Sequence, residues 1–157
     1  MKYYPTPLEQ WIWQLYKRIS ITEASEISEE AFCHYFRIYL FKKSLSSFSY
    51  EQHRYKAITI DDRLSIHEQR EVFFHELCHL LRHAGWQFRD MPLAFKELQE
   101  WDANRFVSYA ALPVHMVAQY DLQHPDIIQI LAEAFKVTPE LCEKRLTRIV
   151  ERAKARA

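Results

Sequence analysis

His75-Glu76-Leu77-Cys78-His79 is the stretch of sequence on which the predicted fold depends. It reads H-E-x-x-H, and a step of four residues along a helix is one turn plus about 40°, so His75 and His79 stand one above the other. Two imidazole nitrogens can then reach one zinc ion at about 2.0–2.1 Å. Glu76 lies about 100° around the helix, where its carboxylate can take a proton from a zinc-bound water. The motif therefore indicates a zinc hydrolase, usually a peptidase.

The flanking residues predict that the motif lies on one long amphipathic helix. Ser65 and Glu68 fit a capping box at its start. Gly85, the only glycine in the protein, stands where a left-handed turn would end the helix. A surface helix with solvated histidines is the alternative, although it gives no reason to stack His75 and His79 with a third histidine, His83. The predicted apolar face, on the side opposite this ridge, consists of Phe73, Leu77, Leu80, Leu81 and Ala84.

A catalytic zinc ion keeps three protein ligands and one water, so two histidines leave one protein ligand to find. His83 is one turn beyond His79, and its ring would lie about 6 Å further along the axis of a straight helix. That distance makes His83 a poor third ligand and favours a role in supporting the ligands or in facing the substrate. Cys78 points about 100° away from His79 and is expected to be a small buried residue.

A second helix, expected from about Pro92 to Leu112, carries the other candidate ligands. Glu100 belongs to a stripe at helical spacing, and the alanines on that stripe allow another helix to approach closely. A carboxylate there is costly to bury without a partner, and a zinc ion is such a partner. Glu97 lies one turn earlier and is the alternative ligand, unless both glutamates are solvated. The stripe consists of Glu100, Ala103, Asn104, Val107 and Ala111.

The two helices together resemble the ImmA/IrrE family of zinc metallopeptidases. The resemblance rests on His75-Glu76-Leu77-Cys78-His79, then Glu100-x-x-Ala103-Asn104-x-Phe106, then Leu112-Pro113. It implies that His75, His79 and Glu100 bind one zinc ion and that Glu76 is the catalytic glutamate. Val107 replaces the family's usual alanine, and the family's methionine before Pro113 is missing.

The resemblance also implies a biological role. Members of the ImmA branch belong to prophages and mobile elements, where they cleave the element's helix-turn-helix repressor. The implied function is therefore a zinc-dependent endopeptidase acting as an anti-repressor. A protein that binds metal and regulates its partner without cleaving it is the alternative, since its ligands would look the same.

Length and composition agree with one enzyme domain over residues 1–157, with a zincin-like core at 1–122 and a C-terminal helical subdomain at 123–157. The 21 basic and 21 acidic residues balance, which argues against direct binding to DNA or to an anionic membrane. Three dispersed cysteines fit reduced thiols in the cytoplasm. No run of about 18 apolar residues occurs, so no membrane span is expected.

The predicted fold class is α+β: a mostly helical, zincin-like domain with a small antiparallel sheet beside the H-E-x-x-H helix. Thr6 and Glu9 form a capping box for a first helix up to Ile19. A short helix at 26–34 is followed by predicted strands at 35–41, 50–54 and 55–60. The sheet edge, near residues 55–61, could hold a peptide substrate as an added strand.

The C-terminal residues predict a helical pair and carry the main rival interpretation. Residues 130–153 read as helix, tight turn and helix, which resembles a helix-turn-helix whose second helix could enter a DNA groove. In that interpretation Arg145, Arg148 and Arg152 would face outward. The alternative is a plain pair of packed helices, and the neutral charge balance favours it.

The peptidase mechanism needs a second electrophile, commonly Tyr or His, to stabilise the oxyanion beside the metal. The sequence offers His83, Tyr55 and Tyr109, with Asn104 as a further residue close to the ligands, and does not choose among them.

Overall fold

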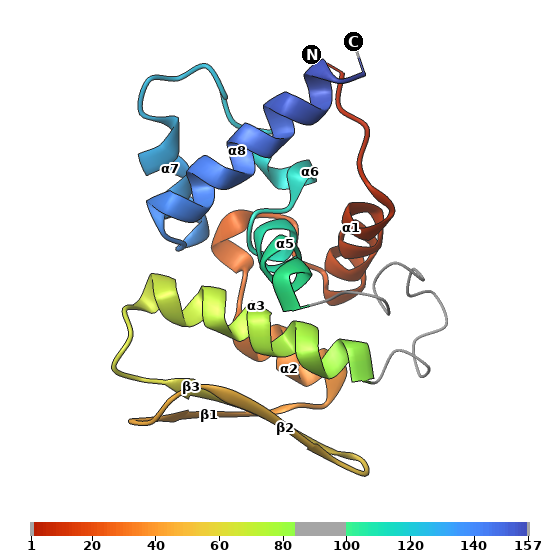
Figure 1. Ribbon diagram of the computed structural model, residues 1–157, viewed down its shortest axis with the longest axis vertical. Helices are drawn as coiled ribbons and strands as arrows, with labels where there is room; N and C mark the ends of the chain where they lie inside the picture. The colour runs from red at the N-terminus through yellow and green to blue at the C-terminus, as the bar shows by residue number, and fades with distance from the viewer. Residues whose placement is uncertain (1, 84–99, 157) are drawn as a thin grey trace.

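The computed structural model describes residues 2–83 and 100–156, with the side chains of residues 83 and 100–102 outside this description. A small sheet lies at one end of the molecule, α3 runs across it, and most of the other helices pack on the far side of α3 (Figure 1). The chain is therefore mostly helical and α+β, as predicted. In chain order the elements are α1 (Pro7–Ile19), a 3-10 helix (Ala24–Glu26), α2 (Glu29–Phe36), β1 (Tyr39–Lys43), β2 (Phe48–Gln52), β3 (Tyr55–Asp61), α3 (Ile66–His83), α5 (Glu100–Ala111), α6 (Val114–Val117), α7 (Ile127–Phe135) and α8 (Pro139–Lys154).

The predicted capping box begins α1. Thr6 Oγ1 accepts a hydrogen bond from the Glu9 amide at 3.1 Å, and Glu9 Oε2 accepts one from the Thr6 amide at 2.7 Å. Pro7 takes the first helical position, where no hydrogen-bond donor is needed. On the buried side, the Tyr16 hydroxyl donates to the carbonyl of Ala110 at 2.6 Å. This buried hydrogen bond ties α1 to α5.

Residues 35 and 36, predicted to begin a strand, instead complete α2. The helix starts at a serine cap, where Ser28 Oγ accepts from the Ala31 amide at 3.3 Å. It ends at Arg37, whose φ of 57° is left-handed and whose amide returns to carbonyls of the last turn. Because the helix continues to Phe36 and Arg37 forms its C-cap, β1 begins only at Tyr39.

The sheet is mixed, which corrects the prediction of an antiparallel one. Its strand order is β1-β3-β2, with β3 parallel to β1 and antiparallel to β2. The segment 55–61 is therefore central and has no free edge for a peptide strand. Burial explains this order, because residues 56–60 are all buried, whereas β1 and β2 carry charged side chains that suit an edge, such as Lys42 and Glu51.

The two faces of the sheet differ in what covers them. Alternate residues of a strand share a face, and the almost fully buried Ile58 and Ile60 point to the side on which α3 packs. On the opposite face, Tyr39 and Tyr55 stack with ring centroids 5.3 Å apart. That outer face exposes five aromatic side chains, namely Tyr39, Phe41, Phe48, Tyr50 and Tyr55.

Helix α3 forms the centre of the core, between the sheet and the other helices (Figure 1). Its predicted apolar face is confirmed as far as the described residues reach, since Phe73, Leu77, Leu80 and Leu81 are all buried. Ala84 and the predicted stop at Gly85 lie outside them. Within the described ranges, none of the helices has the length and apolar character that a bilayer span requires.

All three cysteines are buried and reduced. Loss of hydration raises the pKa of the Cys33 thiol to about 12, and nearby glutamates add to the shift. Burial likewise raises the pKa of the Cys142 thiol to about 12. Cys78 has no exposed surface, in agreement with its predicted place in the core. The folded chain therefore presents no reactive thiolate at neutral pH.

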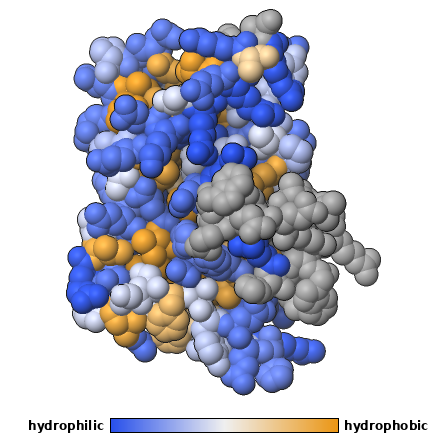
Figure 2. Space-filling model, viewed as in Figure 1, coloured by the Kyte–Doolittle hydropathy of each residue, from blue (hydrophilic) through white to orange (hydrophobic). Residues whose placement is uncertain are grey.

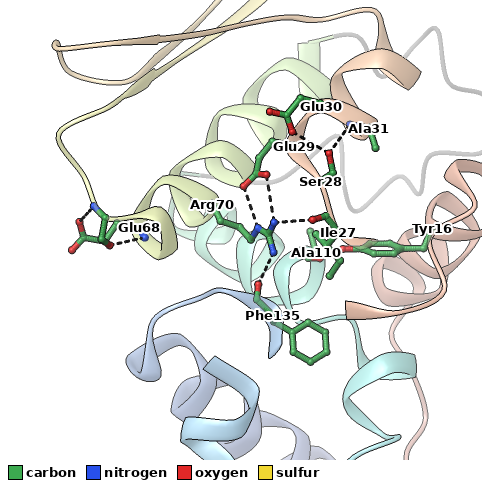
Figure 3. A network of polar contacts seen from close by, with 11 residues as sticks. Tyr16, Ile27, Ser28, Glu29, Glu30, Ala31, Glu68, Arg70, Ala110 and Phe135 are labelled. Atoms are coloured by element: carbon green, nitrogen blue, oxygen red, sulfur yellow. Dashed lines mark hydrogen bonds and ion pairs between the residues drawn. The ribbon is translucent and has the colours of Figure 1, made fainter. Parts of the chain in front are cut away.

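A buried arginine joins the start of α3 to two other helices (Figure 3). Arg70 is 5% exposed, and its guanidinium donates to the carbonyls of Phe135 at 2.7 Å and Ile27 at 2.8 Å. It also pairs with Glu29 at 3.1 Å. Since these partners lie at the end of α7 and at the entry to α2, Arg70 fixes the first half of α3 against both.

A second buried ion pair joins the two ends of the chain. Arg145 Nη2 lies 2.7 Å from Glu9 Oε1, and each side chain is only 1% exposed. Arg145 Nε donates to the carbonyl of Leu112 at 2.9 Å, and its guanidinium lies over the ring of Tyr109. This corrects the prediction that Arg145 faces outward: its partner is a carboxylate on α1, 136 residues away in the sequence.

Substitution of Glu9 by Gln tests the ion pair, because Gln keeps the shape and an acceptor oxygen but removes the charge. The guanidinium of Arg145 would then be buried without a counter-charge, so we expect the free energy of unfolding to fall by about 3–5 kcal/mol. Urea unfolding followed by circular dichroism measures this. The control is Arg63→Met at the exposed Arg63–Asp61 pair, which should hardly move the midpoint. A Glu9→Gln protein as stable as the wild type would contradict the assignment.

Candidate metal centre

The first turn of α3 fixes how the helix presents the H-E-x-x-H motif. Ser65 Oγ accepts from the Glu68 amide at 3.2 Å, and Glu68 Oε2 accepts from the Ser65 amide at 3.2 Å, so the predicted capping box is confirmed. With the apolar side of the helix in the core, His75, Glu76 and His79 lie on its partly buried side. This is the setting that a metal helix needs, since one side is anchored and the other is accessible.

The two imidazoles of the motif converge at their Nε2 atoms. His75 Nε2 and His79 Nε2 are 3.1 Å apart, with the rings inclined at 74°. A tetrahedral zinc ion bound at about 2.0–2.1 Å would hold two ligand nitrogens about 3.3–3.4 Å apart. The pair therefore fits zinc with little adjustment. Nitrogen donors also favour zinc over magnesium or calcium, which prefer oxygen ligands.

The predicted third ligand comes from a helix that packs along α3. The described part of α5, Glu100–Ala111, lies against α3 (Figure 1), with Ala103 fully buried, as expected for a close helix contact. The side chain of Glu100 and the whole of Glu97 lie outside the described residues. Among the side chains that are described, no group of three metal-binding residues forms. The third ligand therefore stays a prediction.

The structure separates the candidates for the second electrophile. Tyr55 lies on the outer face of the sheet, in contact with Tyr39 and Tyr50, whereas α3 covers the inner face. The ring of Tyr109 lies 4.6 Å from the guanidinium carbon of Arg145. Neither tyrosine is brought to the histidine pair by these contacts. His83 is the last described residue of α3, and its side chain is outside the described part of the chain.

Asn104 is the candidate that the structure places beside the motif. It is exposed on α5 and lines the same hollow as His75. This hollow, of about 600 Å³, lies between α3, α5 and α8. Its lining consists of Glu71, Val72, His75, Asn104, Val107, Ser108, Leu141, Lys144 and Arg148.

Besides Glu71, sequence reasoning missed three polar residues of this hollow. Ser108 is 3% exposed, and in the described part of the chain its hydroxyl has no hydrogen-bond partner. Lys144 and Arg148 reach the hollow from α8, about 70 residues beyond the motif. The signal that could have found the two basic residues is their spacing of four, which places both on one face of a helix.

Glu71 is the acidic residue of the hollow, one helical turn before His75. Its Oε1 accepts a hydrogen bond from the hydroxyl of Thr138 at 2.9 Å. Loss of hydration is the largest influence on this carboxyl and raises its pKa above the usual range, although the bond from Thr138 opposes the shift. Because Thr138 also caps α8, this contact holds the start of α8 against α3.

Most of the chain matches a known family of peptidases. The model of the peptidase family described as the IrrE N-terminal-like domain matches residues 18–147. The chain belongs to this family. The resemblance to ImmA/IrrE peptidases expected from the motif is thereby confirmed, and the match spans both α3 and α5.

Two proteins of Bacillus subtilis (strain 168) are similar to this member of the IrrE N-terminal-like family over most of its length. The uncharacterized protein YqaB is 34% identical over 149 residues, which are 94% of this chain and 86% of YqaB. The phage-like element PBSX protein XkdA is 34% identical over 154 residues, which are 97% of this chain and 77% of XkdA. No solved structure gives a significant match.

Replacement of Glu71 by Gln should stabilise the protein at neutral pH. A carboxyl whose pKa is raised on folding destabilises the native state once it is ionised, and Gln keeps an oxygen for Thr138. The advantage of the variant should therefore shrink as the pH falls towards the ordinary glutamate range near ~4.3. Urea midpoints at pH 7 and pH 5 measure this, with the exposed Glu143→Gln as control. If the Glu71→Gln variant were less stable than the wild type at pH 7, ionised Glu71 would not destabilise the folded protein as expected.

Proposed function

We propose that this chain is a zinc-dependent endopeptidase in which His75, His79 and Glu100 hold one metal ion. The observation that carries the proposal is the 3.1 Å approach of the two Nε2 atoms on a helix with the H-E-x-x-H motif. Membership of a peptidase family supports it. The packing of α5 along α3, with Glu100 on α5, agrees with a ligand from that helix.

In the proposed mechanism Glu76 is the general base and acid. When bound, the metal would polarise the scissile carbonyl and acidify the attacking water. Glu76 accepts the proton of that water and then passes it to the amine that leaves. Asn104, which shares the hollow with His75, can donate a hydrogen bond from its amide to the substrate backbone. These roles require an open approach to α3, and both Glu76 and Asn104 retain exposed surface.

We further propose that the substrate is the helix-turn-helix repressor of a prophage or mobile element, cleaved in the cytoplasm. The support is the similarity to XkdA, a protein of the phage-like element PBSX, together with the peptidase family. Cleavage of such a repressor would release the genes that it silences.

The decisive comparison is between wild type and Glu76→Gln, each incubated with the repressor encoded beside it. We expect Glu76→Gln to keep its zinc and to lose cleavage by about 10²–10⁴-fold, because only the proton carrier is removed. His75→Ala should lose both zinc and cleavage. Mass spectrometry of the fragments and elemental analysis of zinc provide the two measurements. A wild type that binds zinc but leaves the repressor intact would instead favour a metal-binding regulator.

The third ligand is tested by comparing two alanine variants. Glu100→Ala should weaken zinc binding more than Glu97→Ala, because loss of a direct ligand removes a bond to the metal. Competition with a chromogenic chelator gives the two zinc affinities. The reverse ranking would assign the metal to Glu97. If both variants bound zinc as tightly as the wild type, neither glutamate would be a ligand.

A further inference from the structure

Helix α8 carries a row of basic side chains that the proposed mechanism does not use. Lys144, Arg148, Arg152 and Arg156 follow one another at intervals of four residues, which places them along one side of the helix and its last turn. The row is about 18 Å long, at 1.5 Å per residue. Figure 2 shows a largely hydrophilic surface over this part of the molecule. Lys144, Arg148 and Arg156 are exposed, and Arg152 is partly buried.

These side chains line two hollows that meet at Arg148. The first is the hollow of about 600 Å³ that contains His75 and Lys144. The second, of about 500 Å³, continues along α5 and α8 towards the end of the chain. Because Arg148 lines both, the two hollows adjoin at its side chain, and we refer to them together as the basic groove. The second hollow is lined by Thr6, Arg105, Tyr109, Arg148, Glu151, Arg152, Ala155 and Arg156.

The groove concentrates positive charge in a protein whose net charge is zero. Among its described lining residues, five are lysine or arginine, and only Glu71 and Glu151 are acidic. In the part of the chain that the structure describes, neither Lys144 nor Arg148 makes a hydrogen bond or an ion pair. Further along, Arg152 donates to the carbonyl of Tyr4 at 2.9 Å. The cations nearest the metal centre are thus the ones left to bind a partner.

A buried hydroxyl points to the same conclusion. Ser108 lines the hollow beside His75, is 3% exposed, and has no hydrogen-bond partner among the described atoms. A buried polar group without a partner is unfavourable, and a ligand oxygen would relieve it. Two cations and one unsatisfied donor on the same hollow are suited to carboxylate oxygens.

We propose that this basic groove binds an acidic segment of the protein substrate and so directs the chain towards the histidine pair. The inference rests on the proposed peptidase function for its purpose, but not for the binding itself. An extended peptide advances about 3.3 Å per residue, so the row on α8 would span five or six residues. The acidic segment would lie beside the scissile bond, on the α8 side of the site.

The geometry favours an acidic peptide over nucleic acid. A DNA-reading helix protrudes so that its side chains enter the major groove. The basic side chains of α8 instead line hollows between helices, where an extended chain can lie. The opposite side of the helix is held against the core by the buried Arg145. Electrostatic complementarity of this kind directs partners and sets orientation.

The probe for the groove is fluorescein-labelled hexaglutamate, measured by fluorescence polarisation in the presence of a metal chelator. The protein carries Glu76→Gln, so that neither zinc nor cleavage contributes to the signal. We expect binding at low ionic strength that weakens at 150 mM salt, and no binding of labelled hexaglutamine. Lys144→Gln with Arg148→Gln should weaken binding about tenfold, since each exposed pair contributes a modest attraction.

The matched control is Lys42→Gln with Lys43→Gln on β1, which removes the same charge from the other end of the molecule. Its affinity for hexaglutamate should equal that of the parent protein. Equal losses in the two double variants, or no binding at low salt, would overturn the proposal. Binding of a DNA duplex through Lys144 and Arg148, without binding of hexaglutamate, would overturn it in favour of a nucleic-acid site. Groove binding by a protein that cleaves no repressor would leave this inference standing and refute the peptidase proposal alone.

Discussion

The buried ion pair between Arg145 and Glu9 is the contact on which the arrangement around the candidate site depends. Neither charge can lose the other without being left unpaired in a medium that solvates it poorly. Arg145 also holds the carbonyl of Leu112, just after α5, so one side chain of α8 is anchored to α1 and to the end of α5. With Thr138 bound to Glu71 at its start, α8 is fixed in both position and rotation. That rotation turns Lys144 and Arg148 towards the hollow beside the motif.

Local patterns predicted the helices well, because caps and apolar periodicity act over a few residues. The boxes at Thr6 and Ser65 and the buried side of α3 are all as expected. The sheet order was not predictable in this way, since strand periodicity defines faces but not neighbours. The prediction that Arg145 faces outward was wrong for a related reason. A helical projection treats an arginine as a solvated residue, and the partner of Arg145, Glu9, is distant in sequence.

The candidate site likewise has a part that local sequence predicts and a part that depends on how the helices pack. The convergence of His75 and His79 follows from a four-residue step on one helix, so the sequence alone contains it. Lys144 and Arg148 of α8 reach the hollow only through the packing of α3, α5 and α8. The residues near the motif do not predict this packing. Tyr55 was a reasonable candidate by residue type, yet strand alternation puts it on the outer face of the sheet. The alternation of side chains along β3 could have excluded Tyr55 from the site once the inner face of the sheet was assigned.

The burial of all three cysteines has a practical consequence for testing the proposed metal site. Thiols at Cys33, Cys78 and Cys142 are enclosed in the core, so they offer a purified sample no surface ligand that would compete for added zinc. In a test of the proposed zinc site, the zinc bound by the native protein would then not include binding at a surface thiol. For the same reason, the reaction of the three cysteine thiols with a thiol-reactive dye would report local unfolding, because the dye would reach a thiol only where core packing is lost.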